Sequence, residues 1–246
     1  MSDSTETSSP RAGWPGVAET TIRLLTFRAG REELVNVTGR HLAFGLACTW
    51  LVGMGRYWDN PRAHLLQHLG VGSIVYVFIL ALFLWLIVWP LRPKNWGYFR
   101  VLVFVSLVSP PAILYALPVE KFYSLEIANT VNELFLLIVA SWRVALLVFF
   151  IRRVAALDGF SILIAAMLPL TLIVVTLTVL NLEKAVFDFM GGMTREETAS
   201  DASYGILFLL SFFSFLLIIP LILCYGALVV YARRKEQDEA LKKFLE

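Results

Sequence analysis

The stretch Ile127–Ile151, IANTVNELFLLIVASWRVALLVFFI, is the part of the chain from which we interpret the rest. It is an apolar run of membrane length with one arginine, Arg143, near its middle. Its 25 residues make about 37 Å of helix at about 1.5 Å per residue, enough to cross a hydrocarbon core of about 30 Å with some tilt. The run therefore predicts a membrane-spanning helix that carries a charge close to mid-membrane.

Four residues of this helix form the candidate intramembrane polar site. Asn132 and Arg143 are eleven positions apart, nearly three whole turns, so both project from one side, and Asn129 and Ala140 border that side. Glu133 lies next to this side, but about 15 Å along the axis from Arg143, too far for an ion pair within one helix. The predicted site is thus Arg143, Asn132, Asn129 and Glu133. Any partner of Arg143 must come from another helix, a lipid headgroup or water.

A charge at this depth costs about 2.5 to more than 10 kcal/mol unless it faces the bundle interior or reaches the membrane surface. Arg143 therefore has three interpretations. It donates to backbone carbonyls freed by prolines in neighbouring helices, it faces a water-filled cavity and handles an anion or a proton-linked movement, or it extends toward the headgroups. Glu133 has two: it reaches the outer interface or joins Asn129 and Asn132 in a local network, or it is a titratable group lining an outward cavity.

The composition excludes an ordinary soluble domain. Of 246 residues, 58% are hydrophobic and 16% charged, and the mean hydropathy is +0.73. The net charge of +2 and the dispersed basic residues give no case for a nucleic-acid partner. Cys48 and Cys224 fall inside apolar segments, so they predict no disulfide framework.

The chain predicts an all-α, polytopic transmembrane bundle of about six membrane-spanning helices. We expect a disordered cytoplasmic tail over 1–16, an amphipathic cytoplasmic or interfacial segment over 17–40, a transmembrane domain over 41–232 and a charged cytoplasmic tail over 233–246 that continues as helix. Prolines at positions 110 and 111 should kink or break the third helix. The predicted helices cover 41–55, 71–91, 101–117, 127–151, 160–182 and 204–232.

The distribution of basic residues predicts the orientation. With six spans, fifteen of the 21 Lys and Arg residues fall on one side, five fall on the other, and Arg143 lies between. This bias places both termini in the cytoplasm by the positive-inside rule.

The sequence contains only weak matches to metal-binding or catalytic motifs. His64 and His68 are four residues apart with Asp59 nearby, a spacing that a solvated interfacial helix explains better than a metal site. We find no glycine-rich phosphate loop, paired carboxylate site or CxxC motif, and no histidine or aspartate accompanies the serines at membrane depth. We therefore expect no catalytic residue, no cofactor and no metal.

The sequence is not identified with any known family. The leading hypothesis is a non-enzymatic structural or assembly component, multi-pass in a bacterial-type inner or plasma membrane. Its expected partners are the lipid bilayer and either other membrane subunits or further copies of the same chain. The alternative is a small transporter or channel with a polar pathway along the helix that carries Arg143, and kinks at prolines 110, 111, 169 and 220.

Overall fold

The computed structural model describes residues 14–55, 65–182 and 201–245, and these ranges contain helices and no strand. The expectations for residues 1–13, for His64 and Asp59, and for the connection over 183–200 lie outside the described residues.

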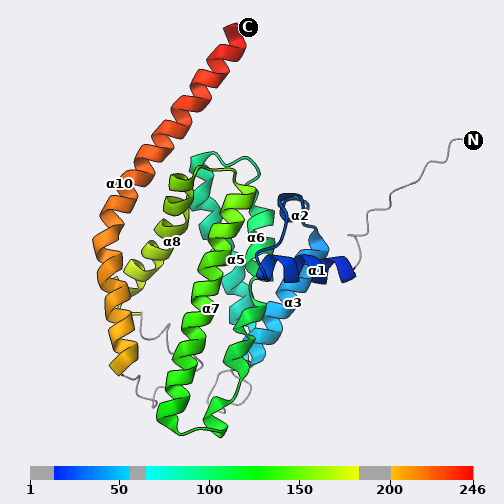
Figure 1. Ribbon diagram of the computed structural model, residues 1–246, viewed down its shortest axis with the longest axis vertical. Helices are drawn as coiled ribbons and strands as arrows, with labels where there is room; N and C mark the ends of the chain where they lie inside the picture. The colour runs from blue at the N-terminus through cyan, green and yellow to red at the C-terminus, as the bar shows by residue number, and fades with distance from the viewer. Residues whose placement is uncertain (1–13, 56–64, 183–200, 246) are drawn as a thin grey trace, which may run out of the picture.

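The helices of the bundle run side by side (Figure 1). The predicted all-α, polytopic bundle is confirmed, and five stretches are long and apolar enough to cross a membrane: Val71–Leu91, Tyr98–Ala116, Thr130–Val154, Gly159–Val179 and Ile206–Leu245. A shorter helix of 17 residues, α3, packs among them. The bundle elements are α3 (Gly39–Gly55), α4 (Leu65–His68), α5 (Val71–Val88), η2 (Trp89–Leu91), α6 (Tyr98–Leu107), η3 (Pro110–Ala116), η4 (Val119–Lys121), α7 (Leu125–Val154), α8 (Gly159–Val179) and α10 (Asp201–Leu245).

The paired prolines break the third predicted helix, as expected. The α-helix α6 ends at Leu107, and the chain continues from Pro110 as the 3-10 helix η3. Proline has no N–H and its ring clashes with the preceding turn, so two in succession end the α-helical hydrogen-bond pattern. The single prolines Pro169 and Pro220 lie inside α8 and α10, which continue through them.

The last helix is much longer than a membrane crossing needs. α10 has 45 residues and reaches Leu245, so the charged tail continues as helix, as predicted (Figure 1). It is attached along one side only. Leu221 packs against Ile164 and Leu168 of α8, and the Tyr225 hydroxyl donates to the Ile87 carbonyl of α5 at 2.7 Å. Most of its other apolar side chains are exposed.

The N-terminal segment folds into two short helices, α1 (Trp14–Leu25) and α2 (Arg31–Val35). α1 lies across the bundle axis, beside α3 and α7 (Figure 1). Two bonds from the bundle hold this segment: the Trp142 indole donates to the Leu25 carbonyl at 3.0 Å, and Arg100 Nε donates to the Val35 carbonyl at 2.8 Å. Its position at a membrane surface remains a prediction.

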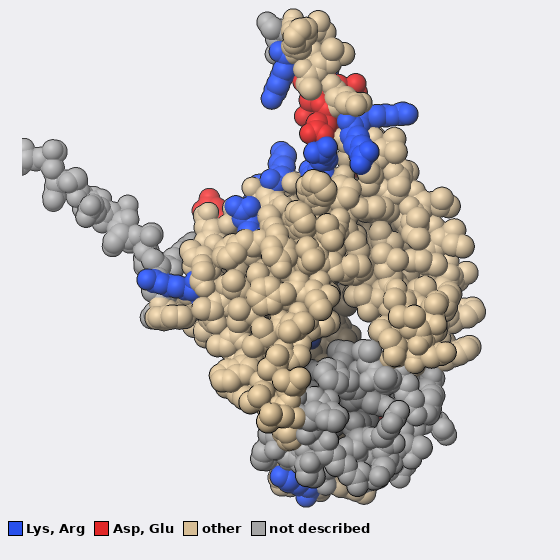
Figure 2. Space-filling view, turned by 180° about the vertical axis from the view of Figure 1, so that it is seen from behind, with Lys and Arg blue, Asp and Glu red and all other residues tan. Residues whose placement is uncertain are grey.

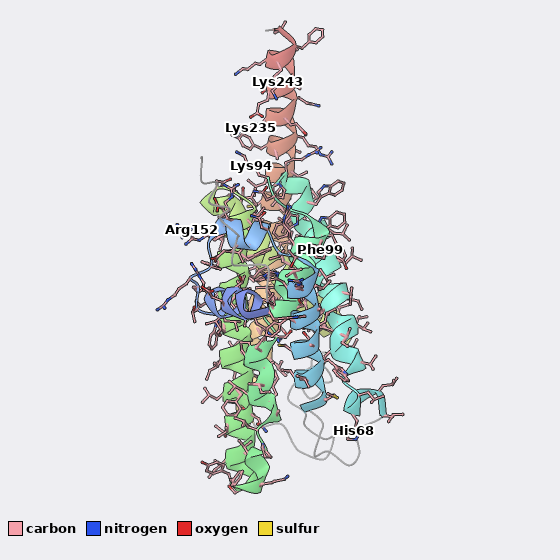
Figure 3. The ribbon with its side chains drawn as sticks, turned by 90° about the vertical axis from the view of Figure 1, so that its right-hand side faces the viewer. His68, Lys94, Phe99, Arg152, Lys235 and Lys243 are labelled. Carbon is pink, nitrogen blue, oxygen red and sulfur yellow. The ribbon has the colours of Figure 1, made fainter. Side chains whose placement is uncertain are left out.

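The basic side chains gather at one end of the bundle. Lys94, Arg152 and Lys235 lie toward this end, which we call the basic end, while His68 lies at the opposite end (Figure 3). On the face shown in Figure 2, the surface between the two ends is almost entirely uncharged. The larger cluster of buried apolar side chains includes Phe104 and Phe150, whose ring centroids stack at 4.1 Å.

Candidate functional site

The candidate site is built on α7, a helix of 30 residues that is about 45 Å long at about 1.5 Å per residue. Its last turn carries Arg152 and Arg153, basic residues that suit the negative end of the helix dipole. Arg143 lies nine residues before Arg152, so it sits about 13 Å below that end of the helix. It is half-buried, on the side of α7 that faces α6 and η3.

Arg143 binds a backbone carbonyl at the break between α6 and η3. Its Nε donates to the carbonyl of Val108 at 3.2 Å. In a continuous α-helix this carbonyl would accept from the N–H of Ala112, but that N–H donates to the Ser109 carbonyl instead, at 3.0 Å. The break thus frees the Val108 carbonyl, and Arg143 takes the place of the missing donor. This is the contact expected under the first interpretation of Arg143.

The same side of α7 continues toward the opposite end of the bundle. Val139, one turn before Arg143, is fully buried against Val52 of α3 and Ala112 of η3. Asn132 lies a further seven residues away, which returns it to nearly the same side of the helix, and it is 8% exposed. The shared side predicted for Asn132 and Arg143 therefore corresponds to the packed interface of α7 with η3.

Glu133 lies apart from Arg143 along α7. Glu133 is 9% exposed, so its carboxylate is buried within the protein and does not extend into the surroundings. Both Asn132 and Glu133 have interaction partners. Ten residues of helix separate Glu133 from Arg143, about 15 Å, so the two charges do not meet. The side chain of Asn129 lies outside the described part of the structure.

A second polar cluster, between α3 and α6, includes Thr49, which the sequence analysis did not single out. The Thr49 hydroxyl lies 2.8 Å from the Gly45 carbonyl and 2.7 Å from the Ser109 hydroxyl, and all three residues are buried. A threonine hydroxyl has one proton, so when Thr49 donates to Gly45 the Ser109 hydroxyl donates to Thr49. Ser106 donates to the Val103 carbonyl at 2.8 Å. Each hydroxyl of the cluster has a partner, and the bond between Thr49 and Ser109 joins α3 to the segment between α6 and η3.

The absence of a side chain at Gly45 allows this close approach. A Cβ atom built on Gly45 would lie 2.8 Å from the Ser106 Cβ and 2.9 Å from its carbonyl carbon. Small residues at helix interfaces let backbones approach in just this way in membrane proteins. The sequence signal was the spacing of Gly45 and Thr49 by one helical turn, which places both on one side of α3.

The two histidines that the structure describes, His41 and His68, are not brought together. His41 is buried at the start of α3, where its Nδ1 lies 3.2 Å from the Thr38 N–H, and His68 lies at the opposite end of the bundle. Across the described ranges, no group of three or more His, Cys, Asp or Glu side chains is arranged to hold a metal ion.

In comparisons with known proteins, no family model, curated protein or solved structure matches the chain.

Proposed function

We propose that the protein is a non-enzymatic integral membrane protein that serves as a structural or assembly component. The carrying observation is the bond from Arg143 Nε to the Val108 carbonyl, because it uses a charge at membrane depth to join α7 to the broken helix α6–η3. The hydroxyls of Thr49 and Ser109 are likewise used between helices. Polar side chains that bond one helix to another in this way favour a structural role for the protein.

The proposed setting is a bacterial-type inner membrane, crossed six times with both termini in the cytoplasm. The basic end carries Lys94, Arg152 and Lys235, which agrees with the cytoplasmic side expected from the positive-inside rule. α10 supports an assembly role, because an apolar helix covered along one side only offers its remaining surface to lipid or to another membrane subunit.

Replacing Arg143 by Met tests the proposal. The variant loses the donor and leaves the Val108 carbonyl unsatisfied in an apolar interface, at a cost of about 1–3 kcal/mol. We expect the melting temperature of the detergent-extracted protein to fall by roughly 2–10 °C. Ser141→Ala is the matched control, since Ser141 is an exposed neighbour on α7 and its loss should leave the melting temperature unchanged. Equal melting of the Arg143→Met variant and the wild type would contradict the structural role.

The second candidate is a small transporter or channel. The observation that favours it is the state of the Arg143 guanidinium: in the described part of the chain its Nε has a partner, whereas its two terminal nitrogens have none. Terminal guanidinium nitrogens without a protein partner can donate to water or to an anion. Reconstituted vesicles provide the test. Flux of protons or chloride that disappears in Arg143→Met but persists in Ser141→Ala would favour transport, and vesicles without flux would favour the scaffold.

A further inference from the structure

A pocket of about 380 Å³ opens at the basic end, between the turn that follows η2 and the side of α10. Lys94 and Lys235, labelled in Figure 3, lie at this level of the molecule. None of the lining residues belongs to the candidate site on α7. They are Trp89, Arg92, Pro93, Lys94, Trp96, Gly97, Arg100 and Glu236.

The pocket carries an excess of positive charge. Three basic side chains, Arg92, Lys94 and Arg100, line it with one carboxylate, Glu236. Glu236 pairs with Arg92 at 3.2 Å, and both side chains are about half exposed. The Lys94 ammonium is exposed and has no partner among the residues that the structure describes. An anion entering the pocket therefore meets one available ammonium and one guanidinium held by a solvent-exposed ion pair.

Arg100, one of the lining residues, is held in place by two backbone carbonyls. Its Nε donates to the Val35 carbonyl at 2.8 Å and its Nη1 donates to the Asn95 carbonyl at 3.3 Å. A planar guanidinium held by two carbonyls keeps one orientation. It contributes a fixed positive charge to the pocket and ties the pocket wall to α2.

The turn that bears the basic residues is preorganised. Arg92 adopts a left-handed conformation with φ of 56°, which ends η2, and its N–H donates to the Trp89 carbonyl at 3.1 Å. The N–H of Lys94 donates to the Ala155 carbonyl beyond α7 at 3.1 Å, and the Trp96 indole donates to the Trp85 carbonyl at 3.2 Å. A site whose backbone is already fixed loses little conformational entropy when it binds a ligand.

The tryptophans beside the pocket predict that it lies where a membrane changes from hydrocarbon to headgroups. Trp89 is 53% exposed and stacks on Trp85 at 5.7 Å, and exposed tryptophans of this kind mark the membrane–water interface. Along the same side of α5 lie the exposed apolar side chains of Leu82 and Leu86. A lipid with its headgroup in the pocket would run its acyl chains down this apolar side.

We propose that the pocket binds the phosphate of an anionic lipid headgroup and that this phosphate competes with Glu236 for Arg92. Basic pockets between membrane helices at the cytoplasmic side suit such headgroups, and Arg and Lys are the usual phosphate partners. The volume of about 380 Å³ is within the range of ligand pockets and is large enough for a headgroup. Binding would thus release α10 from its ion pair with the turn.

Native mass spectrometry of the delipidated full-length protein tests the site, with phosphatidylglycerol, phosphatidylcholine and inorganic phosphate as separate probes. We expect phosphatidylglycerol to bind more tightly than phosphatidylcholine. Arg92→Gln/Lys94→Gln should weaken phosphatidylglycerol binding by roughly tenfold to thirtyfold. This is the size of the attraction that two basic residues near a membrane surface exert together on anionic lipids. The matched control is Lys242→Gln/Lys243→Gln, which removes the same charge from the exposed end of α10 and should bind as the wild type does.

A variant that should bind the lipid more tightly distinguishes loss of the site from misfolding of the protein. Glu236→Gln removes the competing carboxylate and should tighten phosphatidylglycerol binding several-fold, a gain that a damaged protein would not show. Equal affinity of the pocket variant and the Lys242→Gln/Lys243→Gln control would overturn the site. Inorganic phosphate that displaces the lipid at equal concentration would overturn its assignment to a headgroup. The pocket variants leave the bond from Arg143 to Val108 in place, so either proposal can fail alone.

Discussion

At the scale of single residues, Gly45 sets the distance between α3 and α6. Gly45→Ala would push a methyl group against Ser106, whose Cβ would be 2.8 Å away, and we expect a loss of about 1–3 kcal/mol of stability. Thermal melting of the extracted protein measures it. Gly226→Ala in α10 is the control, since a Cβ there meets nothing within 4 Å and alanine favours a helix. A variant at Gly45 that melts like the control would show that the two helices can separate freely.

The sequence was informative about Arg143 and less so about its surroundings. Its depth and the side it shares with Asn132 follow from helical spacing, and prolines at 110 and 111 predict freed carbonyls. The sequence does not predict which carbonyl accepts the bond from Arg143. The Val108 carbonyl is freed because the 3-10 pattern starts at the Ser109 carbonyl, and tertiary packing of η3 against α3 and α7 determines this starting point. The role of Thr49 was missed for the same reason, because its partner Ser109 lies 60 positions away.

At the scale of elements, the break between α6 and η3 and the arginine on α7 should be energetically coupled. Restoring two N–H groups with Pro110→Ala/Pro111→Ala would let α6 continue, so that the N–H of Ala112 returns to the Val108 carbonyl. Arg143→Met should then cost less in this background than in the wild type. A double-mutant cycle measured by thermal melting should give a coupling of about 0.5–3 kcal/mol. Strictly additive effects would mean that the break and the arginine act separately.

The start of α8 depends on one carboxylate. Asp158 accepts from the Ser161 hydroxyl at 2.7 Å and from the Ser161 N–H at 3.0 Å. The hydroxyl bond, and then the backbone bond, hold the pKa of Asp158 below its ordinary value of 3.8. Because the pKa is lower in the folded protein, this contribution to stability is present above the ordinary pKa and is lost as the pH falls through the folded value.

Two substitutions separate the cap from its charge. Asp158→Ala should lower stability near neutral pH by about 1 kcal/mol, whereas Asp158→Asn keeps an N-cap acceptor and does not titrate. The melting temperature of the wild type should therefore fall relative to that of Asp158→Asn as the pH drops from about 5 to about 3. Parallel curves for the two proteins would exclude a role for the carboxylate.

The bounds of the long helices were accurate where hydropathy alone decides them. The predicted 71–91 corresponds to α5 with η2, and the predicted 160–182 is close to Gly159–Val179. The N-terminal segment was predicted only as an amphipathic cytoplasmic or interfacial segment, without helix bounds. Neither α1 nor α2 is long enough to be stable alone. Their position depends on bonds from Trp142 and Arg100, residues that lie far along the chain.

At the scale of the whole molecule, the two ends of the bundle should face opposite sides of a membrane. In a background without Cys48 and Cys224, Phe122→Cys places an exposed thiol just before α7, and Lys243→Cys places one near the end of α10. A membrane-impermeant thiol reagent added to intact cells should label Phe122→Cys. It should label Lys243→Cys only after the cells are permeabilised. Labelling of Lys243→Cys in intact cells would reverse the proposed orientation.

The reach of α10 has a mechanical consequence. The 20 residues from Gly226 to Leu245 lie beyond the bond from Tyr225 to Ile87 and form a rod of about 30 Å. If the ion pair between Glu236 and Arg92 opens, a bend of about 10° in this rod would carry the far tip through an arc of about 5 Å. The tip presents Leu241, Phe244 and Leu245 to solvent. A small change where α10 meets the bundle is thereby magnified into a larger displacement of its exposed tip.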